Sequence, residues 1–271
     1  MRVVRGPASD PASDRERTAE LLAAAADGTP GIRTWTPPRQ VAFGRRDAGE
    51  DGFERAKSLA TERGYRPVER DVGGRAVAYP GNTIAFAHAI PLDDNFGGDD
   101  IDRDGEGVDC AGEGVDRGVG DAERGVDGRS APGSIEGRYE RATVAVVDAL
   151  EALGADVARG EPPGSFCPGN HSIRVAGGGK LSGIAQRVRS DVALVAGCLV
   201  VTRADASEFA AVTESVYGAL GVPFDPSTVG CVADAGGPTD PKRVARAIEN
   251  AFVTGPWGDG DRRVVRIGAD D

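Results

Sequence analysis

Features that mark membrane and secreted proteins are scarce in this sequence of 271 residues. It lacks an apolar run of about 18 residues, the length at which a transmembrane helix would be considered, so we expect no membrane-spanning segment. Its first residues, Met1 to Pro7, lack the apolar stretch of a signal peptide. We therefore expect a cytoplasmic protein.

Metal ligands and excess positive charge are also scarce. The two histidines and four cysteines show no C-x-x-C spacing, so no metal site is predicted, and disulfides are not expected in a reducing cytosol. The formal charge of −11 argues against binding to nucleic acid or to a membrane surface. Cys198 lies in an apolar run and is interpreted as a small buried side chain, whereas Cys110 and Cys231 are assigned no chemistry.

Lysine is rarer still, with three residues against 29 arginines. A lysine kept where arginine is the usual cation suggests a role that the planar, permanently charged guanidinium of arginine cannot fill. One of the three, Lys180, follows Cys167 by thirteen residues. A nearby ammonium raises the thiolate fraction of a cysteine, so this pair suits nucleophilic acyl transfer. The loop around Pro168 and Gly169 would have to fold back to bring the two side chains together.

Residues 93–133 differ from the rest of the chain. They contain eleven glycines and 13 acidic residues against four arginines, a net charge of −9 that leaves −2 for the remainder. With few apolar residues, such a segment cannot offset the entropy lost on ordering, so we predict a disordered insertion. Because it interrupts one pattern, we expect a single domain over residues 1–271. The preference for Asp over Glu and Arg over Lys resembles halophile usage.

Hydrophobic periodicity and capping residues predict helices and strands in separate blocks. The expected helices cover Asp14–Ala26, Gly52–Arg63, Ser134–Leu153, a segment through Phe209 to Leu220, and a last one opened by Pro241. The expected strands are Gln40–Gly44, Tyr65–Arg70, Ala76–Tyr79 paired with Thr83–Pro91, a hairpin of His171–Val175 and Lys180–Val188, and Val192–Val201. This order favours an α+β fold with a mixed, mostly antiparallel sheet packed by helices.

Two glycine motifs are candidates for an anion site. The segment ending in Gly179-Lys180 does not match a phosphate loop, because Arg174 stands where the first glycine is needed and Leu181 follows the lysine. The second motif runs from Arg70 through Gly73, Gly74 and Arg75 to Val77. Paired glycines let the backbone approach a ligand and an arginine holds an anion, although an ordinary turn with surface arginines gives the same pattern.

Taken together, several segments resemble the lipoate/octanoate-protein ligase and transferase family, which is related to biotin protein ligases. The resemblance runs from Arg33 to about Ala235 without the acidic segment. Its anchors are Gly44-Arg45-Arg46-Asp47, Gly64-Tyr65-Arg66-Pro67-Val68-Glu69-Arg70, Gly73-Gly74-Arg75-Ala76-Val77, Gly179-Lys180 and Gly183-Ile184-Ala185-Gln186-Arg187. The resemblance implies the catalytic domain of that family.

The stretch Ser165-Phe166-Cys167-Pro168-Gly169 is similar to the thiol-dependent branch, the octanoyl-[glycine-cleavage H protein]:protein amidotransferases. This implies that Cys167 takes the octanoyl or lipoyl group as a thioester and yields it to a lysine of a lipoyl domain, without a cofactor. Lys180 would stabilise the thiolate and polarise the carbonyl, while Arg70, Gly73, Gly74, Arg75, Val77 and Gly183 would bind the substrate.

The sequence leaves open both the acyl donor and whether the protein is a transferase, a ligase or a binding module. The acyl donor is either the glycine-cleavage H protein or acyl carrier protein. An ATP-dependent ligase shares the glycine loop and the lysine, but usually has an accessory domain after the last helix and lacks the cysteine. A non-catalytic lipoate-binding module would need the cavity but not the thiol. A nucleic-acid or membrane partner is not expected.

Overall fold

The computed structural model describes residues 1–6, 8, 10–70, 74–92, 133–255, 258 and 260–267. Within them the strands form two sheets. The larger has the order β11-β1-β2-β6-β10-β9-β8-β7, and the smaller has the order β4-β3-β5. The strands are β1 (Arg2–Arg5), β2 (Gly31–Trp35), β3 (Gln40–Phe43), β4 (Arg66–Glu69), β5 (Val77–Tyr79), β6 (Ile84–Pro91), β7 (Val157–Arg159), β8 (Ser172–Val175), β9 (Lys180–Val188), β10 (Val192–Leu199) and β11 (Arg263–Arg266).

Four of the described helices begin at a residue whose side chain caps the first turn. Asp10, Ser134, Thr202 and Asp240 each accept a hydrogen bond from a backbone N–H of the first turn, which satisfies a donor that the helix leaves free. The helices are α1 (Pro11–Ala26), α2 (Arg45–Ala48), α3 (Phe53–Glu62), α4 (Ile135–Glu151), α5 (Arg203–Leu220) and α6 (Pro241–Thr254), with a short 3₁₀ turn η2 (Pro226–Thr228).

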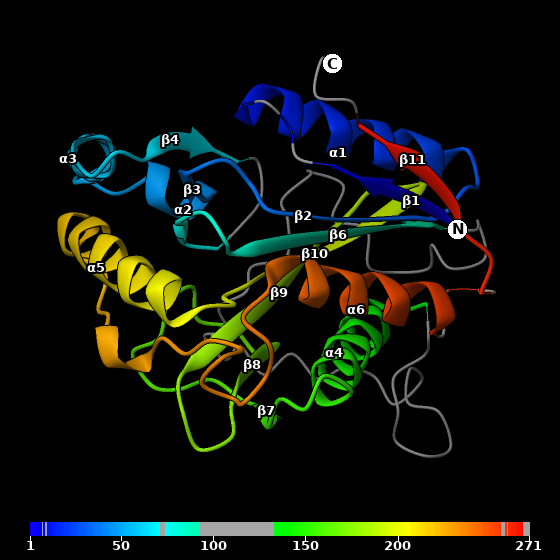
Figure 1. Ribbon diagram of the computed structural model, residues 1–271. Coiled ribbons are helices and arrows are strands. Elements are labelled where there is room, and N and C mark those ends of the chain that lie inside the picture. The colour runs from blue at the N-terminus through cyan, green and yellow to red at the C-terminus, as the bar shows by residue number, and fades with distance from the viewer. Residues whose placement is uncertain are drawn as a thin grey trace, which may run out of the picture.

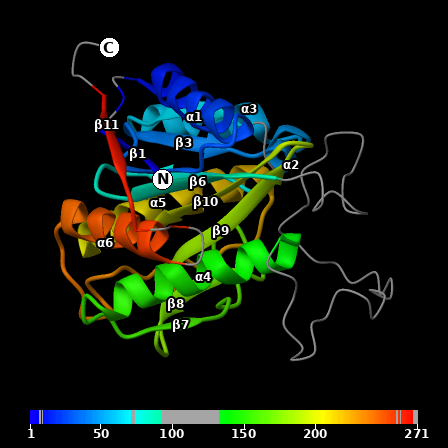
Figure 2. The same ribbon diagram turned by 90° about the vertical axis from the view of Figure 1, so that its right-hand side faces the viewer.

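The large sheet is covered on both faces. Helices α4 and α6 pack on one face, and α1 covers part of the other (Figure 1). The small sheet and α3 lie on the same side of the large sheet as α1, as the view turned by 90° also shows (Figure 2), and the small sheet shares a core with α3 and α5. This arrangement leaves part of the large sheet facing the small sheet, and the strands there carry small side chains: Ala85, Ala185, Ala196 and Gly183.

The expected fold class is confirmed. The large sheet is mixed: β1 pairs in parallel with β2 and β11, and its other five pairings are antiparallel. The five predicted helices are present to within a few residues. Four strands, β1, β2, β7 and β11, were not predicted, because segments of three to five residues with charged or glycine ends carry little period-two signal.

The predicted pairing of Ala76–Tyr79 with Thr83–Pro91 is wrong. Strand β5 pairs with β3 in the small sheet, whereas β6 lies between β2 and β10 in the large sheet. Pro80 has no N–H to donate to a ladder, and Gly81 adopts φ +151°, so the chain changes direction between the strands. This crossing is what places the two sheets against each other.

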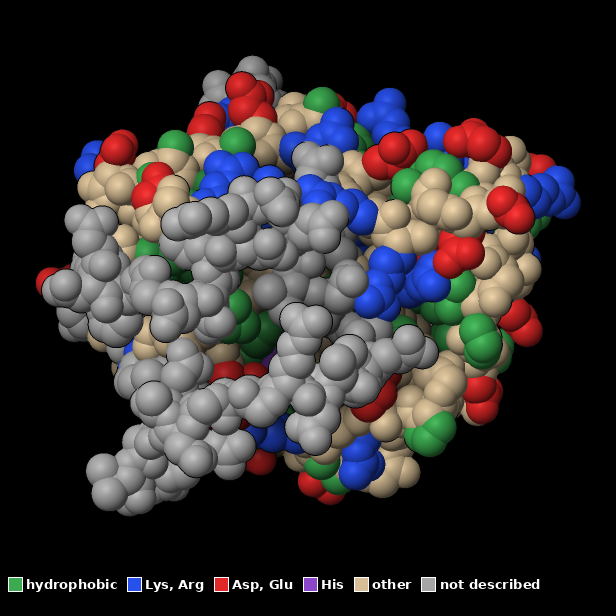
Figure 3. Space-filling model, turned by 180° about the vertical axis from the view of Figure 1, so that it is seen from behind, with side chains coloured by type: hydrophobic (Ala, Val, Ile, Leu, Met, Phe, Trp, Pro, Cys, Tyr) green, Lys and Arg blue, Asp and Glu red, His purple; other side chains and the backbone are tan. Residues whose placement is uncertain are grey.

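Cys110 and the predicted insertion, apart from Gly133, lie outside the described residues. On the face seen from behind, acidic and basic side chains are interspersed over the described surface (Figure 3). Among the described helices, none combines the length and the apolar character that crossing a membrane requires.

Candidate functional site

Cys167 stands in a loop, residues 165–169, that we call the Cys167 loop. Its φ of +39° makes it the one residue other than glycine with a positive φ in the described ranges. That conformation costs an L-residue roughly 1–2 kcal/mol, so the surrounding contacts must hold it. One contact is with Tyr217 of α5: the Cys167 N–H donates to the Tyr217 hydroxyl at 2.8 Å, and this hydroxyl donates to the carbonyl of Ala76 at 3.0 Å. Tyr217 thus ties the Cys167 loop to the start of β5.

Lys180 holds the other side of the Cys167 loop. Strand β9 begins at Lys180, and a register irregularity opposite Ile173/Arg174 of β8 redirects this end of the strand. The ammonium Nζ donates to the carbonyl of Cys167 at 2.8 Å and to that of Phe166 at 2.9 Å. The loop therefore folds back onto β9, and the contact between Cys167 and Lys180 is made through the backbone of the cysteine.

The third partner of Lys180 is Glu161, which the sequence analysis did not single out. Its Oε2 accepts from Nζ at 3.0 Å, and the hydroxyls of Ser165 and Ser172 donate to its two carboxylate oxygens. Lys180 is fully buried, so its charge needs this partner. With two carbonyls and one carboxylate, the three N–H groups of the ammonium are all in use.

The sulfur of Cys167 faces a different set of groups. The backbone N–H of Arg75 approaches Sγ at 3.4 Å. A Cβ on Gly74 would lie 3.0 Å from Sγ and 3.5 Å from Nη2 of Arg70, so only glycine allows this approach. The same Nη2 donates to the carbonyl of Arg75 at 2.8 Å, which fixes the guanidinium beside the sulfur.

The Arg75 side chain points elsewhere. Its guanidinium donates to Glu50 at 2.6 Å and lies 3.5 Å from Asp47, and it does not line the cavity described below. Asp47 is fully buried and accepts from the N–H of Gly44 at 2.9 Å. Burial raises the pKa of Asp47, an effect that these hydrogen bonds and Arg75 partly offset. Arg75 thus contributes its backbone N–H to the site.

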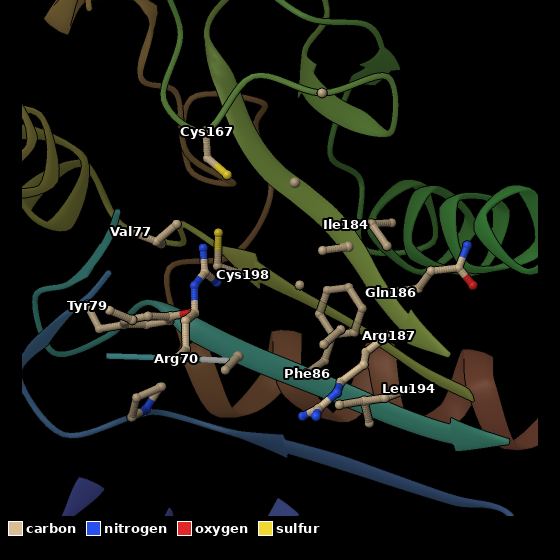
Figure 4. Close-up of a pocket in the computed structure, with 18 of the residues that line it drawn as sticks. Arg70, Val77, Tyr79, Phe86, Cys167, Ile184, Gln186, Arg187, Leu194 and Cys198 are labelled. Carbon is tan, nitrogen blue, oxygen red and sulfur yellow. The ribbon is translucent and has the colours of Figure 1, made fainter. Parts of the chain in front are cut away.

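A cavity of about 190 Å³ opens at the Cys167 sulfur and runs between the two sheets (Figure 4). Its wall is mostly apolar: Val77 and Tyr79 come from β5, Phe86 from β6, and Leu194 from β10. In register along the floor, β9 and β10 place Gly183 opposite Cys198, Ala185 opposite Ala196, and Arg187 opposite Leu194. From Gly183 to Arg187 this floor of the cavity is about 13 Å long, at roughly 3.3 Å per strand residue.

Of the residues singled out from the sequence, Cys167, Arg70, Val77 and Gly183 line this cavity, and Gly74 lies beside the sulfur. Lys180 is behind the wall, and Gly73 lies outside the described residues. Cys198 lines the cavity as well, and burial followed by the neighbouring Cys167 raises its pKa. Glu161 and Tyr217 belong to no motif, and their roles depend on contacts between distant segments.

The two histidines occupy different settings. His171 lines the cavity and stacks on Tyr139 with ring centroids 3.9 Å apart, and burial lowers its pKa. His88 is fully buried on β6 near Phe252, and burial lowers its pKa to about 3, so it is neutral at physiological pH. In the part of the chain that the structure describes, no three His, Cys, Asp or Glu side chains gather in a way that could hold a metal ion.

Comparison with known proteins places this site in context. The model of the lipoyl protein ligase A/B catalytic domain matches residues 126–253. An octanoyl-[GcvH]:protein N-octanoyltransferase of Geobacillus kaustophilus (strain HTA426) is 27% identical over 164 residues, which are 60% of this chain and 45% of the relative. The corresponding protein of Exiguobacterium sp. (strain ATCC BAA-1283 / AT1b) is 24% identical over the same shares. The chain thus spans about half the length of these curated relatives.

Among solved structures, lipoate-protein ligase A bound with ATP superimposes with a TM-score of 0.65 at 19% identity, covering 99% of this chain and 89% of that chain. At this identity the similarity establishes the fold.

Proposed function

We propose that the chain is a member of the lipoate/octanoate-protein ligase and transferase family, to which the catalytic-domain model and the curated octanoyltransferases are similar, and that it transfers an octanoyl or lipoyl group through a thioester on Cys167 to a lysine of a lipoyl-dependent enzyme domain. The name of the Geobacillus relative suggests an octanoylated glycine-cleavage H protein as donor. Acyl carrier protein is the alternative donor.

The reaction exchanges one acyl linkage for another. In the first step the Cys167 thiolate attacks the carbonyl carbon of the donor amide, a C–S bond forms, the C–N bond breaks, and the departing amine gains the proton that the thiol gave up. In the second step the acceptor lysine attacks the thioester, a C–N bond forms, the C–S bond breaks, and the amine proton returns to sulfur. Because no acid has to be activated, the exchange needs no ATP.

The observation that carries the proposal is the position of the thiol at one end of a slim apolar cavity. Three backbone bonds of an extended chain span roughly 3.5 Å, so the seven bonds of an eight-carbon acyl chain span about 8 Å. The cavity floor of about 13 Å between Gly183 and Arg187 accommodates that length. Its small residues leave space for the chain, and its apolar walls favour burying it.

The experiment is to incubate the pure protein with octanoylated H protein and to weigh it intact, with and without ATP. We expect an octanoyl adduct on Cys167 without ATP, and its loss with hydroxylamine, which cleaves thioesters. Cys167→Ala should form no adduct and transfer nothing to a lipoyl domain. The matched control is Cys231→Ala, since Cys231 is buried but lies outside the cavity and contacts Asp234 at 3.0 Å.

The result also separates the alternatives. If Cys167→Ala still modifies a lipoyl domain when it is given free acid and ATP, the protein is a ligase and the nucleophile is misassigned. If the protein binds octanoate but neither variant nor wild type modifies an acceptor with any donor, it is a binding module.

A further inference from the structure

We propose that Arg70, and not Lys180, is the cation that stabilises the negative charge on the acyl oxygen when Cys167 attacks. This inference rests on the transfer reaction proposed above. It divides the two cations of the site into a catalytic residue, Arg70, and a positioning residue, Lys180.

The first observation is access to the reacting atoms. Arg70 lines the cavity beside Cys167, and its guanidinium points toward the sulfurs of Cys167 and Cys198 (Figure 4). Its Nη2 and the Cys167 Sγ both lie within 3.5 Å of the point that a Cβ on Gly74 would occupy. Lys180, by contrast, is fully buried and is not part of the cavity wall.

The second observation is spare hydrogen-bonding capacity. Nε of Arg70 is buried and has no hydrogen-bond partner among the residues that the structure describes, although an unsatisfied buried donor costs about 1–3 kcal/mol. An oxygen entering the cavity would satisfy it. The Lys180 ammonium has no such capacity, because its donors are taken by Glu161 and by the carbonyls of Phe166 and Cys167.

The third observation is how firmly Arg70 is held. Its backbone N–H extends the β4 ladder by donating to Phe43 at 3.0 Å, and its Nη2 donates to Arg75 at 2.8 Å. Burial lowers the pKa of Arg70, but neighbouring groups, Cys167 first among them, outweigh burial and leave the pKa raised. The guanidinium is therefore a fixed and permanent charge, which is what preorganised stabilisation of an oxyanion requires.

These contacts determine where the negative charge is stabilised during the attack by Cys167. As Sγ bonds to the acyl carbon, the carbonyl electron pair moves onto oxygen, and the charge develops between the Arg70 guanidinium and the Arg75 N–H that first faced the sulfur. Arg70 donates hydrogen bonds and keeps its protons. The charge is released when the C–N bond of the donor breaks and the carbonyl re-forms.

The test compares Arg70→Met, Arg70→Lys and Arg70→Ala with wild type in single-turnover acylation by octanoylated H protein. Removing one oxyanion donor costs about 100- to 1,000-fold in rate, so we expect that loss in Arg70→Met at an unchanged half-saturating donor concentration. Arg70→Lys should keep part of the rate, and guanidinium ion should restore part of it to Arg70→Ala. Arg55→Met removes an exposed arginine of α3 and serves as the control.

Hydrogen exchange of the backbone amides of residues 165–169 distinguishes the role of Lys180 from that of Arg70. Exchange should rise in Lys180→Met, which frees the loop carbonyls, and should stay at the wild-type rate in Arg70→Met. Acylation of Arg70→Met at the wild-type rate, or a defect that saturating donor removes, would overturn the catalytic role. Loss of acylation in Lys180→Met with unchanged loop exchange would return that role to the lysine.

These outcomes are distinct from failure of the transfer reaction itself. In that case wild-type protein would form no Cys167 adduct, whereas failure of the Arg70 assignment alone leaves the wild-type adduct intact.

Discussion

The hydroxyl of Tyr217 offers a direct test of whether the Cys167 loop is held for catalysis. It accepts from the Cys167 N–H at 2.8 Å and donates to the Ala76 carbonyl at 3.0 Å, so it joins two walls of the cavity. Burial raises the pKa of Tyr217 well above its ordinary value, so the hydroxyl keeps its proton for Ala76. Tyr217→Phe removes one oxygen and retains the ring, which packs on Phe224 with centroids 5.5 Å apart.

The expected loss of stability follows from the two partners. The Ala76 residue is 2% exposed, so its carbonyl loses its partner without access to water, at a cost of about 1–3 kcal/mol. Cys167 is only half-buried, so water can partly replace the Tyr217 hydroxyl as the acceptor for the Cys167 N–H, and losing this hydrogen bond costs about 1 kcal/mol of stability. We expect a total of about 2–4 kcal/mol, measured by urea unfolding at pH 7.

The expected loss of activity follows from the backbone of Cys167. Once its N–H anchor is gone, the roughly 1–2 kcal/mol held in φ +39° favours relaxation of the loop, which lowers the productive fraction about 5- to 30-fold. Single-turnover acylation should fall by that factor in protein that circular dichroism shows to be folded. Tyr65→Phe is the control, since that buried tyrosine lies in the connection between α3 and β4. A stability loss with acylation unchanged would refute the catalytic reading and leave Tyr217 a core residue.

Two further predictions concern pH and the packing of the C-terminal helix. His88 has a pKa of about 3 in the folded protein against an ordinary 6.5, so the unfolded state binds its proton first as the pH falls. Relative to His88→Gln, wild type should lose about 1.4 kcal/mol of unfolding free energy per pH unit below about 6, and parallel urea midpoints would contradict this. Glu249 is fully buried and accepts from Arg5, Arg246 and Arg262. Burial raises the pKa of Glu249, but the arginines outweigh burial and leave the pKa below its ordinary value of 4.5. The ionised carboxylate therefore stabilises the folded protein at pH values above the unfolded pKa. This stabilisation is lost as the pH falls through the folded pKa. Glu249→Gln should cost about 2 kcal/mol at pH 7 and progressively less as the pH falls below the unfolded pKa, and a cost that does not change with pH would rule out the interaction.

Local chemistry in the sequence determined most of the helices and the segments that carry the site. Helix starts were expected at Ser134 and Pro241, and the helix that was expected to end at Leu220 does end there, with Gly221 at φ +68° as its C-cap. The rarity of lysine drew attention to Lys180, and its segment does meet the Cys167 loop. These features are readable because caps, stops and periodic apolar faces are decided within a few residues.

The orientation of the groups at the site was decided only by the tertiary structure. That Lys180 donates to the backbone of Cys167 while Arg70 lies beside the sulfur depends on how β9 and the small sheet meet. Tyr217 and Glu161 reach the site across 50 and 19 residues of sequence, to Cys167 and Lys180 respectively. Such contacts leave no periodic trace in the chain, because they arise where elements folded by their own local rules are packed together to bury a shared apolar surface.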